Sequence, residues 1–260
     1  MKISNTLISV IVPYYKKKNY IYWSLNSALK QSHKKIELII IYDDENLSDY
    51  FFLKKIINKD KRVKLIKNKK NMGVSFSRNK GIKISKGGFI AFLDADDVWK
   101  KNKLSYQLNY MLKNNLNITH TNYNIINEKN KIIRNMKVTK DLTYKKLLNS
   151  CDIGLSTVMI NSKIKKLLKF ERIKTKEDYV LWLTLSKKYK IIGINKYLTN
   201  WRSVKNSLSS SSIQKFKDGY TVYNNYLGES KVISFFRVLN LSVNFVFKLF
   251  KQKFIFSSIR

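Results

Sequence analysis

Residues 88–97 read GFIAFLDADD, an apolar run that is followed directly by three aspartates within four positions. Similar runs lie upstream, LISVIV at 7–12 and, apart from Glu37, IELIII at 36–41, while RVKLI at 62–66 alternates between polar and apolar residues. Apolar runs rich in β-branched residues are typical of strands that are buried on both faces of a parallel sheet. The sequence therefore predicts four parallel strands in its first hundred residues.

Helical patterns separate these strands, at residues 19–31, 47–58 and 73–85. Alternation of strands and helices predicts a doubly wound α/β fold, in the manner of Rossmann folds. In such sheets ligands bind beyond the carboxyl ends of the strands. Several polar or aromatic residues follow the predicted strands at that edge: Tyr14, Tyr15, Asp43, Asp44, Asp94, Asp96 and Asp97.

The second half of the chain is less regular. The patterns predict helices at 100–113 and 177–188, two short strands within 117–135, a strand at 155–160 and one or two strands within 191–201. The polar stretch 203–212 is the best candidate for a linker, and the remainder is helical.

Composition narrows the function classes. A single cysteine, Cys151, excludes a disulfide framework and a cysteine-rich zinc site. The histidines, His33 and His120, have no metal-ligand spacing, and we expect both to be structural or surface residues. The chain has no glycine-rich dinucleotide fingerprint and no P-loop. It also has no secretory signal and no run of about 20 apolar residues.

The net charge is +35, from 52 Lys and Arg against 17 Asp and Glu. A surface of this charge favours an anionic partner, either nucleic acid or a membrane. An A/T-rich genome would also explain the high net charge. Lysine supplies 45 of the cations, and the 27 asparagines and 30 isoleucines share its A/T-rich codons.

The acidic residues have two interpretations each. Asp94, Asp96 and Asp97 suit a hard divalent cation, although Asp96 or Asp97 could instead cap the following helix. Asp43 and Asp44 carry the same ambiguity before helix 47–58. Glu177 and Asp178 open a predicted helix, where acids are common, or one of them is a general base.

Together these segments resemble family 2 glycosyltransferases. The resemblance rests on SVIVPYYKKKNYIYWSLNSALKQSHKKIELIIIYDDENLSD, on NKKNMGVSFSRNKGIKISKGGFIAFLDADDVW with its DxD motif, on KEDYVLWLTL with its ED motif, and on WRSVKNSLSS. The four segments occur in the order and spacing of the family, over residues 7–212. No helix-turn-helix, zinc-finger or RNA-binding pattern supports the rival interpretation as a nucleic-acid-binding module, so no nucleic acid is expected as a partner. A non-catalytic relative is the other alternative.

The resemblance implies a GT-A fold, a nucleotide-sugar donor with UDP expected, a divalent metal (Mn²⁺ or Mg²⁺) and inversion at the anomeric carbon. It also implies roles for the residues at the motif positions. Asp178 is the catalytic base and Glu177 faces the acceptor or leaving group. Asp96 is the metal ligand, and Asp94 faces the ribose or metal-bound water. Asp44, together with Asp43, accepts a hydrogen bond from the nucleotide base, and Tyr15 stacks on that base. Pro13 shapes the turn at Tyr15, and Arg78 lies near the nucleotide.

The chain departs from the family pattern at three places. Glu45 and Asn46 replace the usual Gly-Ser after the second strand, so that turn is expected to differ. Lys16 replaces the usual asparagine of the first loop. Val204 stands where some members have a histidine, so water rather than histidine should complete the metal coordination.

These observations predict a catalytic domain at 1–212, with a nucleotide-sugar half at about 1–100 and an acceptor half at about 101–212. A helical, amphipathic tail follows at 213–260. In the tail, Arg237, Asn240, Asn244, Lys248 and Lys251 form a polar stripe opposite several phenylalanines. Such a helix can lie in a membrane interface, or it can pack on the domain or on a second copy of the chain. We expect a cytoplasmic enzyme on the inner face of a bacterial membrane that extends a lipid-linked or surface glycan.

Overall fold

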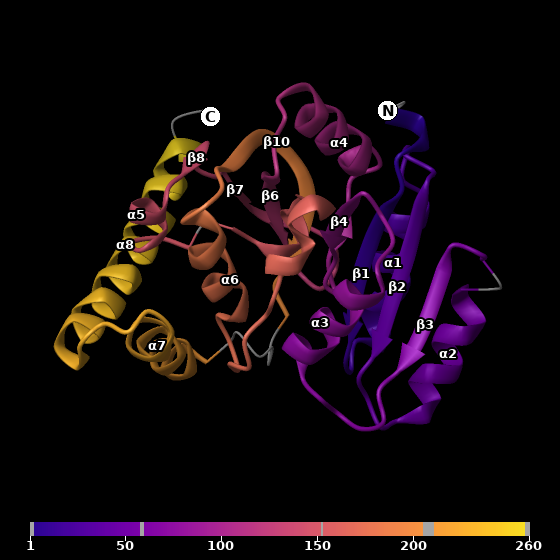
Figure 1. The fold of residues 1–260 in the computed structure, drawn as a ribbon, viewed down its shortest axis with the longest axis horizontal. Coiled ribbons are helices and arrows are strands. Elements are labelled where there is room, and N and C mark those ends of the chain that lie inside the picture. Colours follow the sequence, from indigo (N-terminus) through magenta and orange to yellow (C-terminus); the bar gives the residue numbers. More distant parts are fainter. Residues whose placement is uncertain (1–2, 58–59, 152, 205–210, 258–260) are drawn as a thin grey trace.

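The four apolar runs form the parallel part of one sheet. A computed structural model describes residues 3–57, 60–151, 153–204 and 211–257. Its first strands are β1 (Ile8–Tyr14), β2 (Ile36–Tyr42), β3 (Val63–Lys67) and β4 (Phe89–Phe92). They lie in the order β3-β2-β1-β4, and each adjacent pair is parallel (Figure 1). The expected parallel sheet is therefore present in the first hundred residues.

The second half of the chain extends the same sheet. Its strands are β5 (Val98–Trp99), β6 (Ile118–Ile126), β7 (Ile132–Met136), β8 (Asp141–Leu142), β9 (Met159–Asn161) and β10 (Ile191–Arg202). The order continues from β4 as β9-β6-β10-β5, with β7 paired to β6 and β8 to β10. Because β9 is antiparallel to both β4 and β6, those two strands run in the same direction, as does β10.

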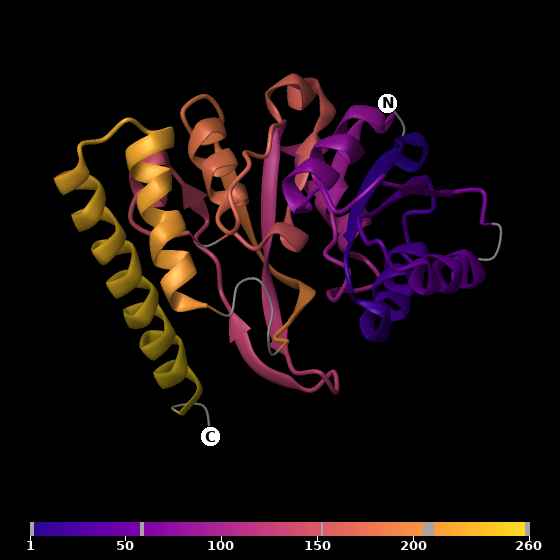
Figure 2. The same ribbon diagram turned by 90° about the horizontal axis from the view of Figure 1, so that it is seen from below.

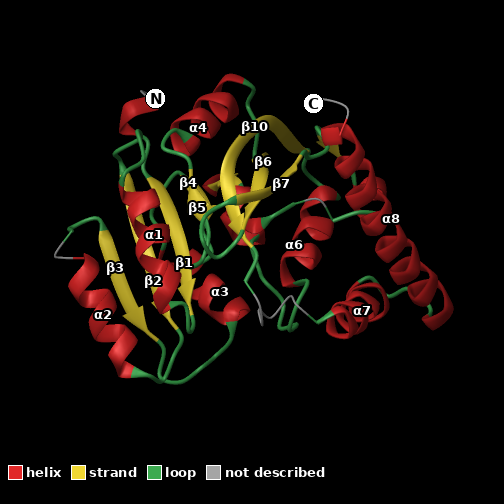
Figure 3. Ribbon diagram, turned by 180° about the vertical axis from the view of Figure 1, so that it is seen from behind, coloured by secondary structure: helices red, strands yellow, loops and turns green. Residues whose placement is uncertain are grey.

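Helices cover both faces of the sheet (Figure 3). The α-helices are α1 (Lys18–Leu29), α2 (Leu47–Ile57), α3 (Val74–Ile84), α4 (Lys103–Lys113), α5 (Tyr144–Leu147), α6 (Glu177–Ser186), α7 (Ser212–Thr221) and α8 (Lys231–Ser257). Shorter helical turns are Ile3–Asn5, Leu155–Thr157, Ser162–Leu167 and Val222–Tyr226. Helices α1, α2 and α4 pack in one core with one face, and α3, α5, α6 and α8 share the core of the other.

Residues 191–201 lie in one strand, β10, which agrees with the expected one or two strands; its register is irregular near Tyr197. Two details differ from the sequence expectations. Residues 155–160 do not form one strand, since Leu155–Thr157 is a helical turn and β9 begins only at Met159. Of the expected linker at 203–212, positions 205–210 fall outside the described residues, and Ser212 already begins α7.

Helix α8 lies on the outer flank of the molecule, beside α7 (Figure 2). Its inner side buries Ser234, Val238 and Leu241 against the domain. The polar stripe faces the domain as well, because Asn240 and Asn244 donate hydrogen bonds to Asn149. The stripe's Lys248 and Lys251 lie outside the residues whose side chains are described.

The opposite side of α8 exposes apolar side chains, among them Phe236 at 63% and Phe247 at 70%. Helix α8 thus packs on the domain along one side, while most of the described opposite side is exposed. In the described chain, no helix combines the length and the apolarity that crossing a bilayer requires.

Candidate active site

The expected site residues lie where β1, β2 and β4 end and where α6 begins, except for Arg78, which lies in α3. Pro13 is buried in β1 beside Ile41 of β2, and Tyr15 follows that strand with 40% of its surface exposed. Lys16 then turns the chain in the left-handed region, with φ of 48°. The ring of Tyr15 is thus partly exposed at the edge of the sheet, with the ammonium of Lys16 5.1 Å from its centre.

Asp44 joins the loops that follow β1 and β2. Its Oδ2 accepts a hydrogen bond from Lys16 N at 3.3 Å, and its Oδ1 accepts one from Asn46 N at 3.1 Å. Between these loops lies a pocket of about 240 Å³, lined by residues 16–20, Asp44, Asn46 and Asp49. In the altered Glu45-Asn46 turn, Asn46 Oδ1 caps α2 by accepting from Ser48 N at 2.9 Å. Capping of α2 by Asp43 or Asp44 is therefore excluded.

Asp43 is engaged by its own chain. The carboxylate is buried and accepts hydrogen bonds from Asn68 Nδ2 at 2.7 Å, Met72 N at 2.8 Å and Gly73 N at 2.8 Å. Gly73 precedes α3 with φ of 87°, a conformation that glycine adopts without strain. These contacts make Asp43 the anchor of the loop that starts α3.

The three aspartates after β4 have different partners. Asp96 Oδ2 lies 2.7 Å from the ammonium of Lys17, and Asp94 Oδ1 accepts from Arg78 Nη2 at 2.8 Å. Asp97 is buried, and its Oδ1 accepts from the backbone N of Arg202 at 2.9 Å. Helix α4 begins at Lys103 with Asn102 as N-cap, so capping by Asp96 or Asp97 is ruled out.

Arg78 connects this acidic loop with α6. Its guanidinium is buried, donates to both Asp94 and Glu177, and lies over the ring of Phe170. Burial alone would lower the pKa of Arg78, but the two carboxylates outweigh burial and raise the pKa. The structure therefore brings the DxD and ED segments together through one arginine.

Asp178 lies beside this pair, on the first turn of α6. Its Oδ1 accepts from Tyr179 N at 2.8 Å. Burial and the charge of Glu177 raise the pKa of Asp178 to about 7, against the opposing influence of Arg78 and Lys176. A carboxylate with a pKa near neutrality is well suited to accept a proton from a hydroxyl.

Asp96 fits a divalent cation. Burial raises the pKa of Asp96, and the neighbouring Asp94 adds to the rise, whereas Lys17 opposes it. The ammonium of Lys17 is thus a cation already seated on this carboxylate. The described residues contain no group of three acidic, histidine or cysteine side chains arranged for a metal, so phosphate and water oxygens would supply the other ligands.

Sequence reasoning missed Lys17 and Arg202. Arg202 Nε donates to the carbonyl of Asp96 at 2.8 Å, and its Nη atoms donate to the carbonyl oxygens of Asn127 and Glu128 and to Asn130 Oδ1. The scarcity of arginine could have revealed it, because only 7 of the 52 cations are arginine. A chain so biased toward lysine keeps arginine where a planar fork is needed.

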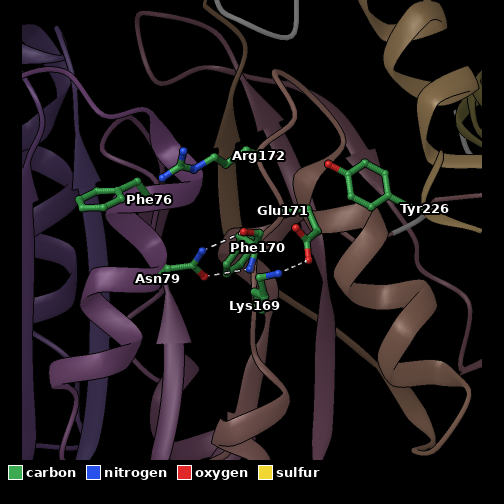
Figure 4. A pocket seen from close by; sticks show the side chains of 7 residues that line it. All are labelled: Phe76, Asn79, Lys169, Phe170, Glu171, Arg172 and Tyr226. Atoms are coloured by element: carbon green, nitrogen blue, oxygen red, sulfur yellow. Dashed lines mark hydrogen bonds and ion pairs between the residues drawn. The ribbon is translucent and has the colours of Figure 1, made fainter.

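A second pocket, of about 350 Å³, lies beside the cluster, between α3 and the segment before α6 (Figure 4). Asn79 and Phe170 exchange two hydrogen bonds across its floor, of 2.8 and 2.9 Å. Phe76 and Tyr226 line opposite sides, and Arg172 lies at one end (Figure 4). This seam fixes the loop that leads to Asp178 against the helix that carries Arg78.

Known proteins are similar to this chain in sequence and in fold. Residues 9–169 match the model of the family described as "Glycosyl transferase family 2". A relative from Escherichia coli, the UDP-Glc:alpha-D-GlcNAc-diphosphoundecaprenol beta-1,3-glucosyltransferase WfgD, is 36% identical over 239 residues, which are 91% of this chain and 92% of the relative.

Two solved structures show the same fold. The TarS 1–349 fragment of S. aureus in complex with UDP-GlcNAc has a TM-score of 0.67 at 19% identity, covering 87% of this chain and 69% of that one. The mannosyltransferase PcManGT of Pyrobaculum calidifontis, in complex with GDP-Man and Mn²⁺, has a TM-score of 0.65 at 12% identity, covering 86% and 64%. With its DxD and ED carboxylates gathered on one arginine, the chain belongs to glycosyl transferase family 2 and is a sugar-transferring enzyme with the GT-A fold.

Proposed function

We propose that this enzyme transfers glucose from UDP-glucose to a hydroxyl of a lipid-linked N-acetylglucosamine diphosphate, with inversion at the anomeric carbon. The activity printed for the E. coli relative, which matches over almost its whole length, supports this choice of substrates. The observation that carries the proposal is the buried Arg78, which holds Asp94 and Glu177 together beside Asp178. Donor and acceptor chemistry therefore meet within one cluster.

The donor would lie along the carboxyl edge of β1, β2 and β4. The pocket of about 240 Å³ there offers Asp44 to the base, and Tyr15, 40% exposed, offers a ring for stacking. Pro13 fixes the path of the chain ahead of that ring, and Asp43 supports the site from behind by holding the start of α3. Asp94 would face the ribose or a metal-bound water.

A divalent cation, Mn²⁺ or Mg²⁺, would act as a Lewis acid on the leaving diphosphate. Asp96 would hold it, and Lys17, displaced from that carboxylate, would remain close enough to contact a phosphate oxygen. Arg78 keeps Asp94 oriented, and Arg202 fixes the backbone of Asp96 through its carbonyl. These contacts place the acidic loop before substrate arrives, so little reorganisation would be required at the moment of reaction.

Asp178 would take the proton of the acceptor hydroxyl as it attacks the anomeric carbon from the face opposite to the leaving diphosphate. A single displacement requires one base and inverts the configuration. Glu177, held by Arg78, would face the acceptor and keeps the pKa of Asp178 high.

We further propose that residues 1–212 carry the donor site and the catalytic carboxylates, and that the tail 213–260 attaches the enzyme through α8 to an anionic membrane at the cytoplasmic face. The exposed apolar side of α8 and the net charge of +35 support a lipid partner rather than nucleic acid. A lipid-linked acceptor would be presented at the same surface.

The test incubates the full chain with Mn²⁺, a panel of nucleotide sugars and a synthetic GlcNAc-diphosphate-alkyl acceptor. We expect UDP-glucose to react and NMR to show a new β-linkage, whereas Asp96→Asn abolishes both transfer and donor hydrolysis. Asp141→Asn, at an exposed carboxylate of β8, is the matched control. An α-linked product would contradict inversion at the anomeric carbon. A preference for another donor would contradict the choice of UDP-glucose, and full activity in excess chelator would contradict the metal requirement.

A further inference from the structure

Helix α7 is fastened to the loop that precedes the catalytic pair. Asp218 of α7 is buried, and its Oδ2 accepts hydrogen bonds from Thr175 N at 2.8 Å and Thr175 Oγ1 at 2.6 Å. Its Oδ1 accepts from Gln214 Nε2 at 2.9 Å. This connection brings Lys215, one turn before Asp218, into the neighbourhood of Lys176, the residue after Thr175.

These two lysines carry charge that no carboxylate balances at close range. Both side chains are half-buried, and within the described chain neither ammonium has a carboxylate oxygen within 4.0 Å. Asp218, which lies closest in sequence to Lys215, has both oxygens occupied by Thr175 and Gln214. Burial and the charge of Lys176 lower the pKa of Lys215, so the pair is held together at an electrostatic cost.

The backbone at Lys176 is strained as well. Four described non-glycine residues have positive φ, and two of them are asparagines, which tolerate this conformation. The other two are Lys16, at the end of β1, and Lys176, with φ of 71°, at the N-cap of α6. Strain of this kind persists where the surrounding structure enforces it, and it concentrates at functional sites.

The position of Lys176 relative to Asp178 indicates which anion this pair of lysines would bind. Lys176 is two residues from Asp178 and its charge opposes the rise in the pKa of that carboxylate. An anion bound by Lys176 would therefore lie close to the acceptor hydroxyl. In a sugar diphosphate, the ring of that sugar separates the hydroxyl from the phosphates.

We propose that Lys176 and Lys215 form a subsite for the diphosphate of the acceptor, which makes the enzyme select a sugar diphosphate over an uncharged glycoside. This subsite rests on the proposed function, since it requires Asp178 to face the acceptor. The donor also contains a diphosphate, and the experiment distinguishes the two sources. Ammonium groups binding phosphate oxygens form charge-assisted hydrogen bonds, which are stronger than neutral ones.

The experiment compares Lys176→Asn, Lys215→Gln and the control Lys217→Gln in the full chain. Asparagine tolerates the left-handed backbone at position 176, and Lys217 is an exposed residue of the same helix. Each protein is assayed with a GlcNAc-diphosphate-alkyl acceptor and with the matching uncharged GlcNAc-alkyl glycoside. We expect KM for the diphosphate acceptor to rise about tenfold or more in the first two variants, the scale of one lost charged contact. The donor KM, the KM for the glycoside and the Lys217→Gln enzyme should change less than about twofold.

Calorimetry of the same two acceptor compounds without donor gives a readout that does not depend on turnover. The parent should prefer the diphosphate, and Lys176→Asn and Lys215→Gln should lose that preference. An unchanged preference in both variants would overturn the subsite, and a rise in donor KM alone would assign the lysines to the donor. If the parent binds the diphosphate acceptor with the expected lysine dependence but transfers no sugar, the subsite stands and the proposed donor is wrong.

Discussion

The guanidinium of Arg78 binds two carboxylates that we assign to different substrates. Asp94 lies on the loop assigned to the donor, and Glu177 is adjacent to the residue assigned to the acceptor. A lysine at this position could not replace the arginine, because a single ammonium cannot present two parallel donors to separate partners in a fixed plane. The ionic connection between Asp94 and Glu177 therefore depends on one side chain.

The rate of transfer should depend on pH through Asp178. Since burial and Glu177 raise the pKa of this carboxyl to about 7, it is protonated below that pH and cannot take a proton from the acceptor. We expect kcat to fall about tenfold per pH unit below pH 7 and to level off above it, as measured from pH 5.5 to 9.

Asp178→Asn should lower kcat by about two to four orders of magnitude while donor affinity, measured by calorimetry, stays nearly constant.

Glu177→Gln provides the matched comparison for this profile. Removing the charge of Glu177 takes away an interaction that raises the pKa of Asp178, so the acid limb should move to lower pH. An acid limb that stays in place in Glu177→Gln would show that the titrating group is not Asp178.

At the scale of elements, α3 lies directly on β1 and holds Arg78 over the site. Gly81 makes this approach possible, because a Cβ there would come within 2.5 Å of Cγ2 of the buried Ile11. The helix therefore lies closer to the strand than any larger residue would allow.

Gly81→Ala should therefore force α3 away from β1 and disturb Arg78, one turn earlier in the helix. We expect a loss of about 1–3 kcal/mol of stability, the usual cost of overpacking, which corresponds to roughly 2–4 °C in Tm per kcal/mol. Thermal melts and donor KM should both change. Gly88→Ala is the control, since its nearest contact would be an ordinary 3.7 Å from Thr6, and an equal effect of the two changes would contradict this account.

The regular elements of the first hundred residues could be predicted from the sequence because β1 and β4 are apolar runs, β2 is apolar except for Glu37, and β3 alternates between polar and apolar residues. The small strand β5 could not, since Val98–Trp99 is defined only by its pairing with distant β10. The same holds in the site. Motif positions predicted Asp94, Asp96 and Asp178, but the Lys17–Asp96 pair depends on how two loops meet in space. Among 45 lysines, nothing local distinguishes Lys17.

At the scale of the whole molecule, α8 carries apolar side chains on both sides. Val238 and Leu241 are buried against the domain, where Asn240 and Asn244 also bond, whereas Phe236 and Phe247 face outward. An apolar face of this kind is typical of an interaction surface. Together with the basic composition, it agrees with attachment to anionic lipid.

Binding to vesicles that contain anionic lipid should separate the contribution of apolar burial from that of attraction between lysines and lipid. Phe236→Ser with Phe247→Ser should release the enzyme at any salt, since both side chains lose apolar burial of about 25 cal/mol per Å². Replacing Lys248, Lys251 and Lys253 with Gln should weaken binding mainly at low salt, by roughly 1 kcal/mol per charge.

Phe51→Ser is the matched control, because that residue of α2 is 60% exposed but lies away from α8. Sedimentation with vesicles measures binding, and donor hydrolysis should persist in every variant. Equal release by the α2 change, or failure of the parent to sediment, would assign α8 another partner.

The ion pair between Lys17 and Asp96 also bears on how the protein behaves in the laboratory. The acidic loop carries its own counter-ion at 2.7 Å, so mutual repulsion of its carboxylates should not unfold chelator-treated enzyme. Such a preparation should keep its circular dichroism spectrum and its Tm within a few degrees, and activity should return on adding Mn²⁺ with no refolding delay. Lys17→Gln should lack this reversibility and melt earlier without metal, which would make it the variant that must be purified and stored with the ion present.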